Sequence, residues 1–335
     1  MIKNYKMEPV IERNSIPSLL KILSSDYSII APQERNGEVV FDDLKDPECL
    51  VLGYKVTILP PKKYLFPPEE ILFTYSGKGV RTPSITSKKL LIFGLSLRDL
   101  EAITQLDEIM STPHPDYFYW KRRSRSILVG VTDESVHAPP GGDLILERMD
   151  DELYRAIPLT QAGKKIVKGR FFKKQDILPH KGEGNQVMEE LRKLLLDPET
   201  LAEAVKWSRA EGHPVWEELG KRCIGCGICT YVCPICHCFS MENSVSLDGS
   251  TCTRCRKWDA CTLPGFARIA GGYDHHPSQK KRYYNWYYHK FVRGYKEYGK
   301  SQCVACGRCQ TYCPARIDIE KELLGIVKDY REACG

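Results

Sequence analysis

Short hydrophobic runs alternate with turn-forming residues over the first 180 positions of the chain. Four apolar, β-rich runs bounded by Pro and Gly have the character of buried strands, and they occupy residues 27–30, 71–75, 90–93 and 127–131. Residues 143–149 and 152–157 flank a short acidic turn and predict a β-hairpin. This part of the chain is therefore expected to be rich in strands.

A helical pattern follows Gly94. Ser96 is expected to cap this helix, with Asp99 three residues further on. One face of the helix carries the apolar residues Leu97, Leu100, Ile103, Leu106 and Met110. Together with the strands, this strand–glycine–helix unit predicts that residues 1–180 form a mixed α/β domain.

The composition changes near residue 180. Residues 178–184 combine Pro, Gly and charges, as linkers between domains do. Helices are expected over residues 186–196 and 198–210, and Asp197 caps the second. A second domain is therefore expected over residues 185–335.

Cysteine is distributed very unevenly. The chain has 15 cysteines, of which all but Cys49 and Cys334 lie between Cys223 and Cys313. No run of about 18 apolar residues occurs, and charges interrupt the N-terminal segment, so we expect neither a membrane span nor a secretory signal. A cytoplasmic location is therefore expected. In that reducing compartment, dense cysteines hold metal more often than they form disulfides.

One cysteine motif occurs twice. Its spacing, C-x2-C-x2-C-x3-C-P, begins at Cys223 and again at Cys303. Three thiolates on a tight loop can bind three irons of one cubane, and in two-cluster ferredoxins the fourth cysteine reaches the other cluster. A zinc site would leave the third and fourth cysteines of both motifs unexplained. The ligands expected for cluster I are Cys223, Cys226, Cys229 and Cys313, and those expected for cluster II are Cys303, Cys306, Cys309 and Cys233.

Two [4Fe-4S] clusters with crossed ligands must lie close together, which suits the transfer of single electrons in series. Each cluster with four thiolates adds roughly two negative charges, so two of them offset most of the formal charge of +6. The predicted fold class is α+β, with an N-terminal mixed α/β domain followed by a helical, bacterial-type two-cluster ferredoxin domain.

A long insertion, residues 234–302, separates the two motifs. Four of its five cysteines could hold a third [4Fe-4S] cluster or a zinc ion, or the five could be buried small hydrophobic residues. They are Cys236, Cys238, Cys252, Cys255 and Cys261. Residues 275–299 interleave basic and aromatic side chains. This pattern predicts either a nucleic-acid surface or a helix whose aromatic rings pack over the clusters, while its basic groups offset cluster charge or face a partner.

Several segments besides the paired motifs carry a resemblance to a known family. They are residues 223–239, 256–261, 270–272, 289–291 and 303–318. In these segments the chain resembles the iron–sulfur β subunit of cytoplasmic sulfhydrogenases and the A subunit of anaerobic sulfite reductase. The resemblance spans nearly the whole chain and is strongest after residue 220.

The resemblance implies a non-catalytic electron-transfer subunit. Proteins of that family lie between a flavin subunit that takes hydride from NAD(P)H and a terminal subunit, either a nickel–iron hydrogenase or a sirohaem sulfite reductase. The chain itself contains no dinucleotide fingerprint and no evident flavin motif, so hydride chemistry would occur on another polypeptide.

The chain departs from the family in its N-terminal domain. The family commonly carries a cysteine there in a G-x-R-P-C-D segment, whereas this chain reads G-L-S-L-R-D from Gly94 to Asp99. The resemblance therefore does not extend an N-terminal cluster to this chain. Two alternatives stay open at this point, namely a stand-alone iron–sulfur enzyme with a substrate site in the N-terminal domain and an iron–sulfur protein that binds nucleic acid.

Overall fold

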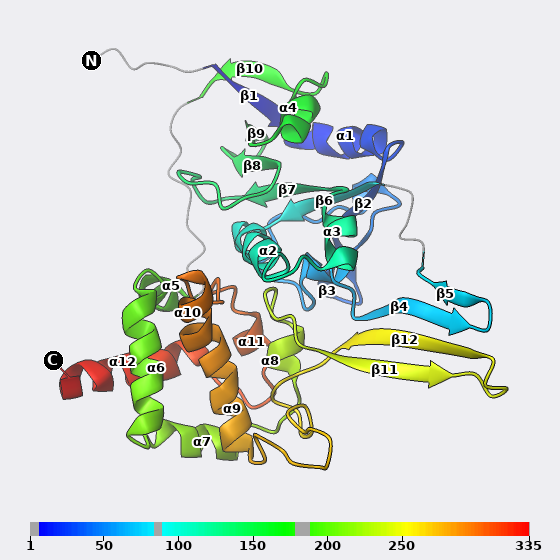
Figure 1. Cartoon of the computed structure of the whole chain (residues 1–335). Helices are drawn as coiled ribbons and strands as arrows, with labels where there is room; N and C mark the ends of the chain where they lie inside the picture. Colours follow the sequence, from blue (N-terminus) through cyan, green and yellow to red (C-terminus); the bar gives the residue numbers. More distant parts are fainter. Residues whose placement is uncertain (1–6, 84–88, 178–187, 335) are drawn as a thin grey trace. The chain divides into compact units, whose positions relative to one another are not determined.

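The computed structural model describes residues 7–83, 89–177 and 188–334 of a mixed α/β chain (Figure 1). The chain forms two compact units. The first contains residues 1–65 and 85–186, and the second contains residues 66–84 and 187–335. Residues 66–84 thus belong to the second unit, although a single boundary near residue 180 was expected. The expected linker, residues 178–184, lies outside the described residues.

The first unit is built on a mixed eight-stranded sheet with the order β10-β1-β9-β8-β7-β6-β2-β3. Its centre is parallel, because β2 pairs with β6, β6 with β7 and β7 with β8 in parallel register, and the outer pairs are antiparallel. The strands are β1 (Met7–Glu12), β2 (Tyr27–Arg35), β3 (Glu38–Asp43), β6 (Lys89–Leu95), β7 (Ser126–Thr132), β8 (Leu144–Arg148), β9 (Leu153–Pro158) and β10 (Lys173–Asp176).

Helices cover both faces of this sheet. Helices α1 (Ile16–Leu23) and α4 (Gln161–Val167) share a hydrophobic core with Val129 of β7, whereas α2 (Leu97–Ile109) packs against Gly130, whose Cβ position would lie 2.7 Å from Leu100. Successive strand residues face opposite sides of a sheet, so α2 lies opposite α1 and α4.

The sequence predicted the central elements of this unit. The strands expected at residues 27–30, 90–93 and 127–131 are confirmed, and so are the hairpin of β8 and β9 and the helix capped by Ser96, whose hydroxyl accepts a hydrogen bond from the Asp99 amide. Gly94 lies near the end of β6, two residues before Ser96, with a φ of 80°, and a Cβ there would lie 2.8 Å from Pro32. The position therefore requires glycine.

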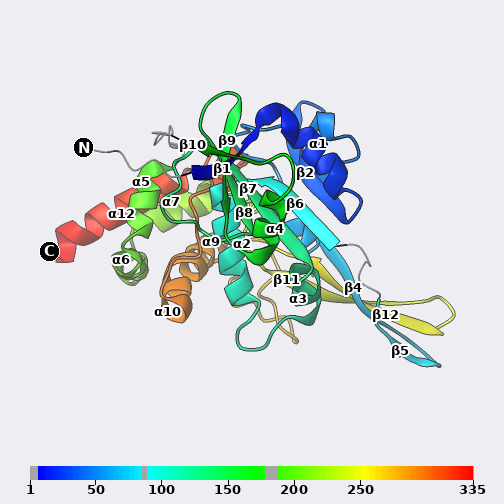
Figure 2. The same ribbon diagram turned by 90° about the horizontal axis from the view of Figure 1, so that it is seen from above.

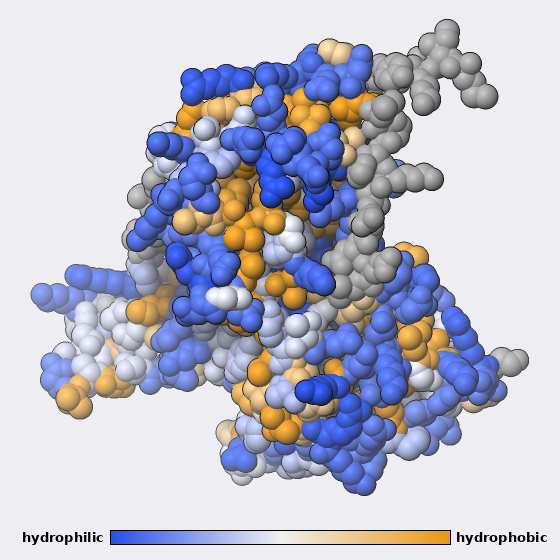
Figure 3. Space-filling model, turned by 180° about the vertical axis from the view of Figure 1, so that it is seen from behind, coloured by the Kyte–Doolittle hydropathy of each residue, from blue (hydrophilic) through white to orange (hydrophobic). Residues whose placement is uncertain are grey.

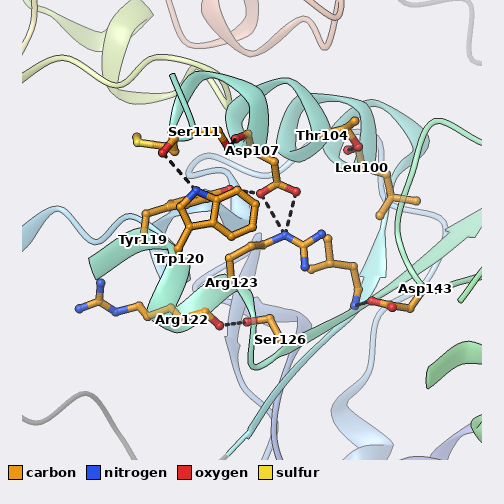
Figure 4. A network of polar contacts seen from close by, with 12 residues as sticks. Leu100, Thr104, Asp107, Ser111, Tyr119, Trp120, Arg122, Arg123, Ser126 and Asp143 are labelled. Atoms are coloured by element: carbon orange, nitrogen blue, oxygen red, sulfur yellow. Dashed lines mark hydrogen bonds and ion pairs between the residues drawn. The ribbon is translucent and has the colours of Figure 1, made fainter. Parts of the chain in front are cut away.

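A polar network joins α2 to α3 (Tyr117–Arg123), as Figure 4 shows. The Asp107 carboxylate accepts hydrogen bonds from the Tyr119 hydroxyl at 2.6 Å and from Arg123 Nε at 3.0 Å. The Trp120 indole donates to the Met110 carbonyl at 3.1 Å. Burial and Asp107 raise the pKa of Tyr119, so its hydroxyl remains a proton donor to the carboxylate.

The second unit contains a four-stranded antiparallel sheet with the order β11-β12-β4-β5. Its strands are β4 (Glu69–Ser76), β5 (Gly79–Arg81), β11 (Phe239–Val245) and β12 (Thr251–Trp258). The strand expected at residues 71–75 is thus present as part of β4, but it pairs with β12 and not with the N-terminal sheet. Strands β11 and β12 extend away from the helices of this unit in Figures 1 and 2.

Helices form the rest of the second unit around a core that includes Trp216, Tyr287, Phe291 and Leu323. They are α5 (Glu189–Leu195), α6 (Pro198–Ala210), α7 (Val215–Arg222), α8 (Ile228–Tyr231), α9 (Gln279–Tyr287), a π-helix (Tyr288–Arg293), α10 (Gly294–Tyr298), α11 (Arg308–Thr311) and α12 (Ile319–Cys334). Helices α5 and α6 were predicted. Over the described residues, no helix combines the length and the apolar character needed to cross a membrane.

Candidate metal centre

Each cysteine motif folds as a tight loop that ends in a one-turn helix. Gly227 and Gly307 precede helices α8 and α11, and both have a φ of 77°, a conformation that glycine adopts without strain. The third cysteine of each motif, Cys229 or Cys309, lies in the helix, and the fourth follows it. Helices α8 and α11 contact each other, so the two loops lie side by side.

Two neighbouring cavities separate the cysteines into groups. The first cavity, about 440 Å³ with its open mouth included, is lined by Cys223, Cys226, Cys229 and Cys313. The second cavity, about 350 Å³ with its open mouth likewise included, is lined by Cys303, Cys306, Cys309 and Cys233. Cys309 also lines the first cavity. In both cavities the fourth cysteine of one motif therefore joins the first three of the other.

The surroundings of the sulfur atoms fit iron–sulfur ligands. Donors point at the sulfurs from several directions, since Gln279 Nε2 lies 3.1 Å from Cys223 Sγ, the Ala305 amide 3.5 Å from Cys303 Sγ and the Ile317 amide 3.4 Å from Cys313 Sγ. Hydrogen bonds of this kind stabilise and tune metal-bound thiolates. The loops thus present both the sulfur ligands and the donors that such ligands require.

Burial controls the protonation of these thiols. It raises the pKa of Cys229 and of Cys303 to about 12 and that of Cys309 well above its ordinary value. Without a compensating charge, these thiols would therefore be protonated at neutral pH. Bound iron would supply that charge, and a thiol that coordinates it would therefore be deprotonated.

Two polar side chains that contact cysteine sulfurs come from the insertion, and the sequence did not indicate which sulfur each one contacts. Gln279 begins α9, and Lys290 lies in the π-helix with its Nζ 3.1 Å from Cys233 Sγ. Aromatic side chains of the same segment also reach the site, since Tyr283 and Trp286 line the first cavity. The predicted helix with aromatic rings over the cysteines is thus present.

The structure does not bring the five cysteines of the insertion together. Cys236 is hydrogen-bonded to Cys233, and this contact, together with burial, raises the pKa of Cys236. Cys261 is hydrogen-bonded to Cys238, and this contact, together with burial, raises the pKa of Cys261. Cys252 and Cys255 lie on β12, opposite Val245 and Glu242.

The distance along β12 separates these two groups. Phe239, which follows Cys238, pairs with Trp258, and Cys252 lies six residues further along the strand, or about 20 Å. Cys255 lies three residues, or about 10 Å, from Trp258. Any four of the five cysteines include Cys252 or Cys255, so every such set contains a cysteine that β12 carries away from Cys238. Cys49 and Cys334 are exposed, and neither lines either cavity.

Comparisons with known proteins agree with this site. Residues 222–317 match the 4Fe-4S dicluster domain family, which indicates two [4Fe-4S] clusters. The sulfhydrogenase 2 subunit beta of Pyrococcus furiosus is 30% identical over 327 residues, which cover 92% of this chain and 94% of the relative. No solved structure matches the chain. Given a relative of this identity over nearly its full length, the chain belongs to the family of sulfhydrogenase beta subunits, the iron–sulfur electron-transfer family that its sequence resembles.

Proposed function

We propose that the chain relays single electrons through its two clusters, between a flavin subunit that reacts with NAD(P)H and a terminal subunit, either a nickel–iron hydrogenase or a sirohaem sulfite reductase. The observation that carries this proposal is the pair of adjacent cavities that share Cys309. Clusters held there lie close enough to exchange electrons. When bound, they supply one-electron chemistry over a wide range of potentials.

The crossed ligand sets are part of the same proposal. Cluster I is held by Cys223, Cys226, Cys229 and Cys313, and cluster II by Cys303, Cys306, Cys309 and Cys233. The lining of the two cavities supports this assignment. Crossing gives the protein a mechanical link between its motifs, because each cluster fastens one loop to the end of the other. The chain's part is to hold the clusters, donate hydrogen bonds to sulfur and exclude water.

Apolar side chains bury much of each site. Trp286 and Ile317 line the first cavity, and Ile235 and Val304 line the second. All four side chains belong to residues at most 3% exposed. A dry surrounding strengthens the effect of every nearby charge on a cluster. We place the complex in a reducing compartment such as the cytoplasm, because so many thiols must remain available for iron.

One face of the four-stranded sheet supports docking on another subunit. Side chains alternate along each strand, and the register aligns Val245, Cys252, Tyr75 and Val80 in one row across all four strands. Phe239 and Met241 lie on the same face of β11. We call this surface the apolar face. The opposite face carries polar residues that include Glu242, Ser244 and Lys257.

The apolar face is exposed to solvent. Tyr75 is 54% exposed, Val245 62% and Val80 65%. Figure 3 shows hydrophobic residues among hydrophilic ones on this sheet. An antiparallel sheet with one apolar face needs a cover for that face. Two arginines also lie on this face. Arg256 is buried in an ion pair with Glu70, whereas Arg254 is half-buried and contacts Asn243, so the partner subunit should present an apolar surface with a carboxylate opposite Arg254.

Anaerobic purification of the tagged chain from its native source tests the function. We expect it to co-purify with a flavoprotein and a terminal metal-containing subunit, and NAD(P)H should reduce its clusters in that complex. A monomer that turns over a substrate without partners would contradict the electron-transfer role and favour a stand-alone enzyme.

A further inference from the structure

A buried lysine lies beside the second cavity. Lys290 is 5% exposed and belongs to the π-helix Tyr288–Arg293. A π-turn widens the helix locally, and such turns are frequent at functional sites. Here it directs Lys290 inward to the cavity that Cys233, Cys303 and Cys306 line.

Three contacts fix the position of the Lys290 ammonium. Its Nζ donates to Cys233 Sγ at 3.1 Å and to the Gln302 carbonyl at 3.2 Å, and it lies 5.3 Å from the centre of the Trp286 ring. The Gln302 amide in turn donates to the Lys290 carbonyl at 2.7 Å. The lysine is thus held next to two expected ligands of cluster II, Cys233 of the first motif and Cys303 of the second.

The first cavity has a different donor. Cys223 Sγ accepts a hydrogen bond from the neutral amide of Gln279, and Arg282 lies one side chain further out, with its Nη2 2.9 Å from Gln279 Oε1. The hydrogen bond to Cys223 thus comes from a neutral amide, whereas the one to Cys233 comes from a cation.

We propose that Lys290 is a positioning residue for electron transfer, whose fixed positive charge raises the reduction potential of cluster II above that of cluster I. The inference rests on the proposed electron-transfer function. Reduction adds one negative charge to a cluster, and a buried cation stabilises the reduced form more than the oxidised form. Within the pair, electrons then move from cluster I to cluster II.

Redox titration of the purified full-length holoprotein, followed by EPR, tests this proposal. The signal of cluster II is identified as the one lost in Cys306→Ser. In Lys290→Met, which keeps the length of the side chain but not its charge, the equilibrium constant for reduction of cluster II should fall at least tenfold, a shift of at least 59 mV. Lys290→Arg keeps the charge and should keep the potential.

Two further variants make the test decisive. Gln279→Leu is the matched control, and it should change cluster I more than cluster II. Lys290→Gln retains a donor in case the methionine variant loses iron, and it should lower the potential of cluster II in the same direction. Unchanged potentials, a shift confined to cluster I, or loss of iron from both uncharged variants would overturn the proposal. Clusters with the expected potentials that accept no electrons from a partner would instead contradict only the proposed function.

Discussion

The side chains of Glu70 and Arg256 form a buried ion pair between positions 186 residues apart, with 2.6 Å between Glu70 Oε2 and Arg256 Nη2. The guanidinium also lies 4.6 Å from the centre of the Phe66 ring and 5.5 Å from that of Phe239. Both charged side chains are less than 10% exposed. The pair fastens β4 to β12 at the base of the four-stranded sheet, so residues 66–84 fold with the C-terminal unit.

Removal of one partner should destabilise this sheet strongly. In Arg256→Met, Glu70 is left as a buried charge without its cation, and the loss of one member of a buried pair costs about 3–5 kcal/mol. Thermal unfolding of the holoprotein, followed by circular dichroism, should show a clearly lower midpoint. The double variant Glu70→Leu with Arg256→Met should recover much of the loss, because no buried charge remains.

Lys257→Met is the control on the same strand. It breaks the exposed pair between Lys257 and Glu242, whose atoms are 2.7 Å apart, and exposed pairs contribute about 0–1 kcal/mol. If Arg256→Met and Lys257→Met lowered the midpoint equally, the buried pair would not hold the sheet together.

The position of residues 66–84 illustrates what a single sequence can predict. A short apolar, β-rich run identified a strand at residues 71–75, but such a run does not specify the strand with which it pairs. The partner, β12, lies in the insertion some 180 positions away. In contrast, β2, β6, β7 and α6 were predicted because each has a local signal, such as the N-cap Asp197.

The cysteines were predicted more fully than their surroundings. Motif spacing alone located the eight expected ligands, since the spacing is set by the geometry of the cubane. Lys290 and Gln279 could not be matched to individual sulfurs, because a π-turn and a helix start bring them to the site from a separate segment. The cysteines of the insertion were grouped by count, whereas the strand register separates Cys252 and Cys255 from the other three.

Crossed ligation predicts which variants should have the same defect. Cys313→Ser removes a ligand of cluster I, so its reduced EPR spectrum should lose the same signal as Cys226→Ser. The matched control is Cys306→Ser, which shares a motif with Cys313 and should lose the signal of cluster II instead. If Cys313→Ser and Cys306→Ser lost the same signal, each motif would hold its own cluster.

The apolar face predicts an asymmetric effect of charge on assembly. Val245→Asp places a carboxylate on this face at a residue that is 62% exposed, and it should weaken binding of the partner subunit at least tenfold, which corresponds to about 1.4 kcal/mol. Ser244→Asp adds the same charge at the adjacent residue on the opposite face. Quantitative co-purification measures both.

The comparison is informative only if both proteins fold. Iron content should therefore be unchanged in Val245→Asp and in Ser244→Asp, because both residues lie on β11, away from the two cavities. Equal recovery of the partner with both variants would show that the apolar face is not a docking surface.

Iron and acid-labile sulfide, measured on the anaerobically purified chain together with EPR of the reduced protein, decide whether two clusters occupy the paired cavities. We expect eight irons and eight sulfides per chain, four of each for every cluster, and a reduced spectrum broadened by magnetic interaction between two neighbouring clusters. Four irons per chain, two clusters without magnetic interaction, or zinc without labile sulfide would contradict the assignment of an adjacent pair of [4Fe-4S] clusters.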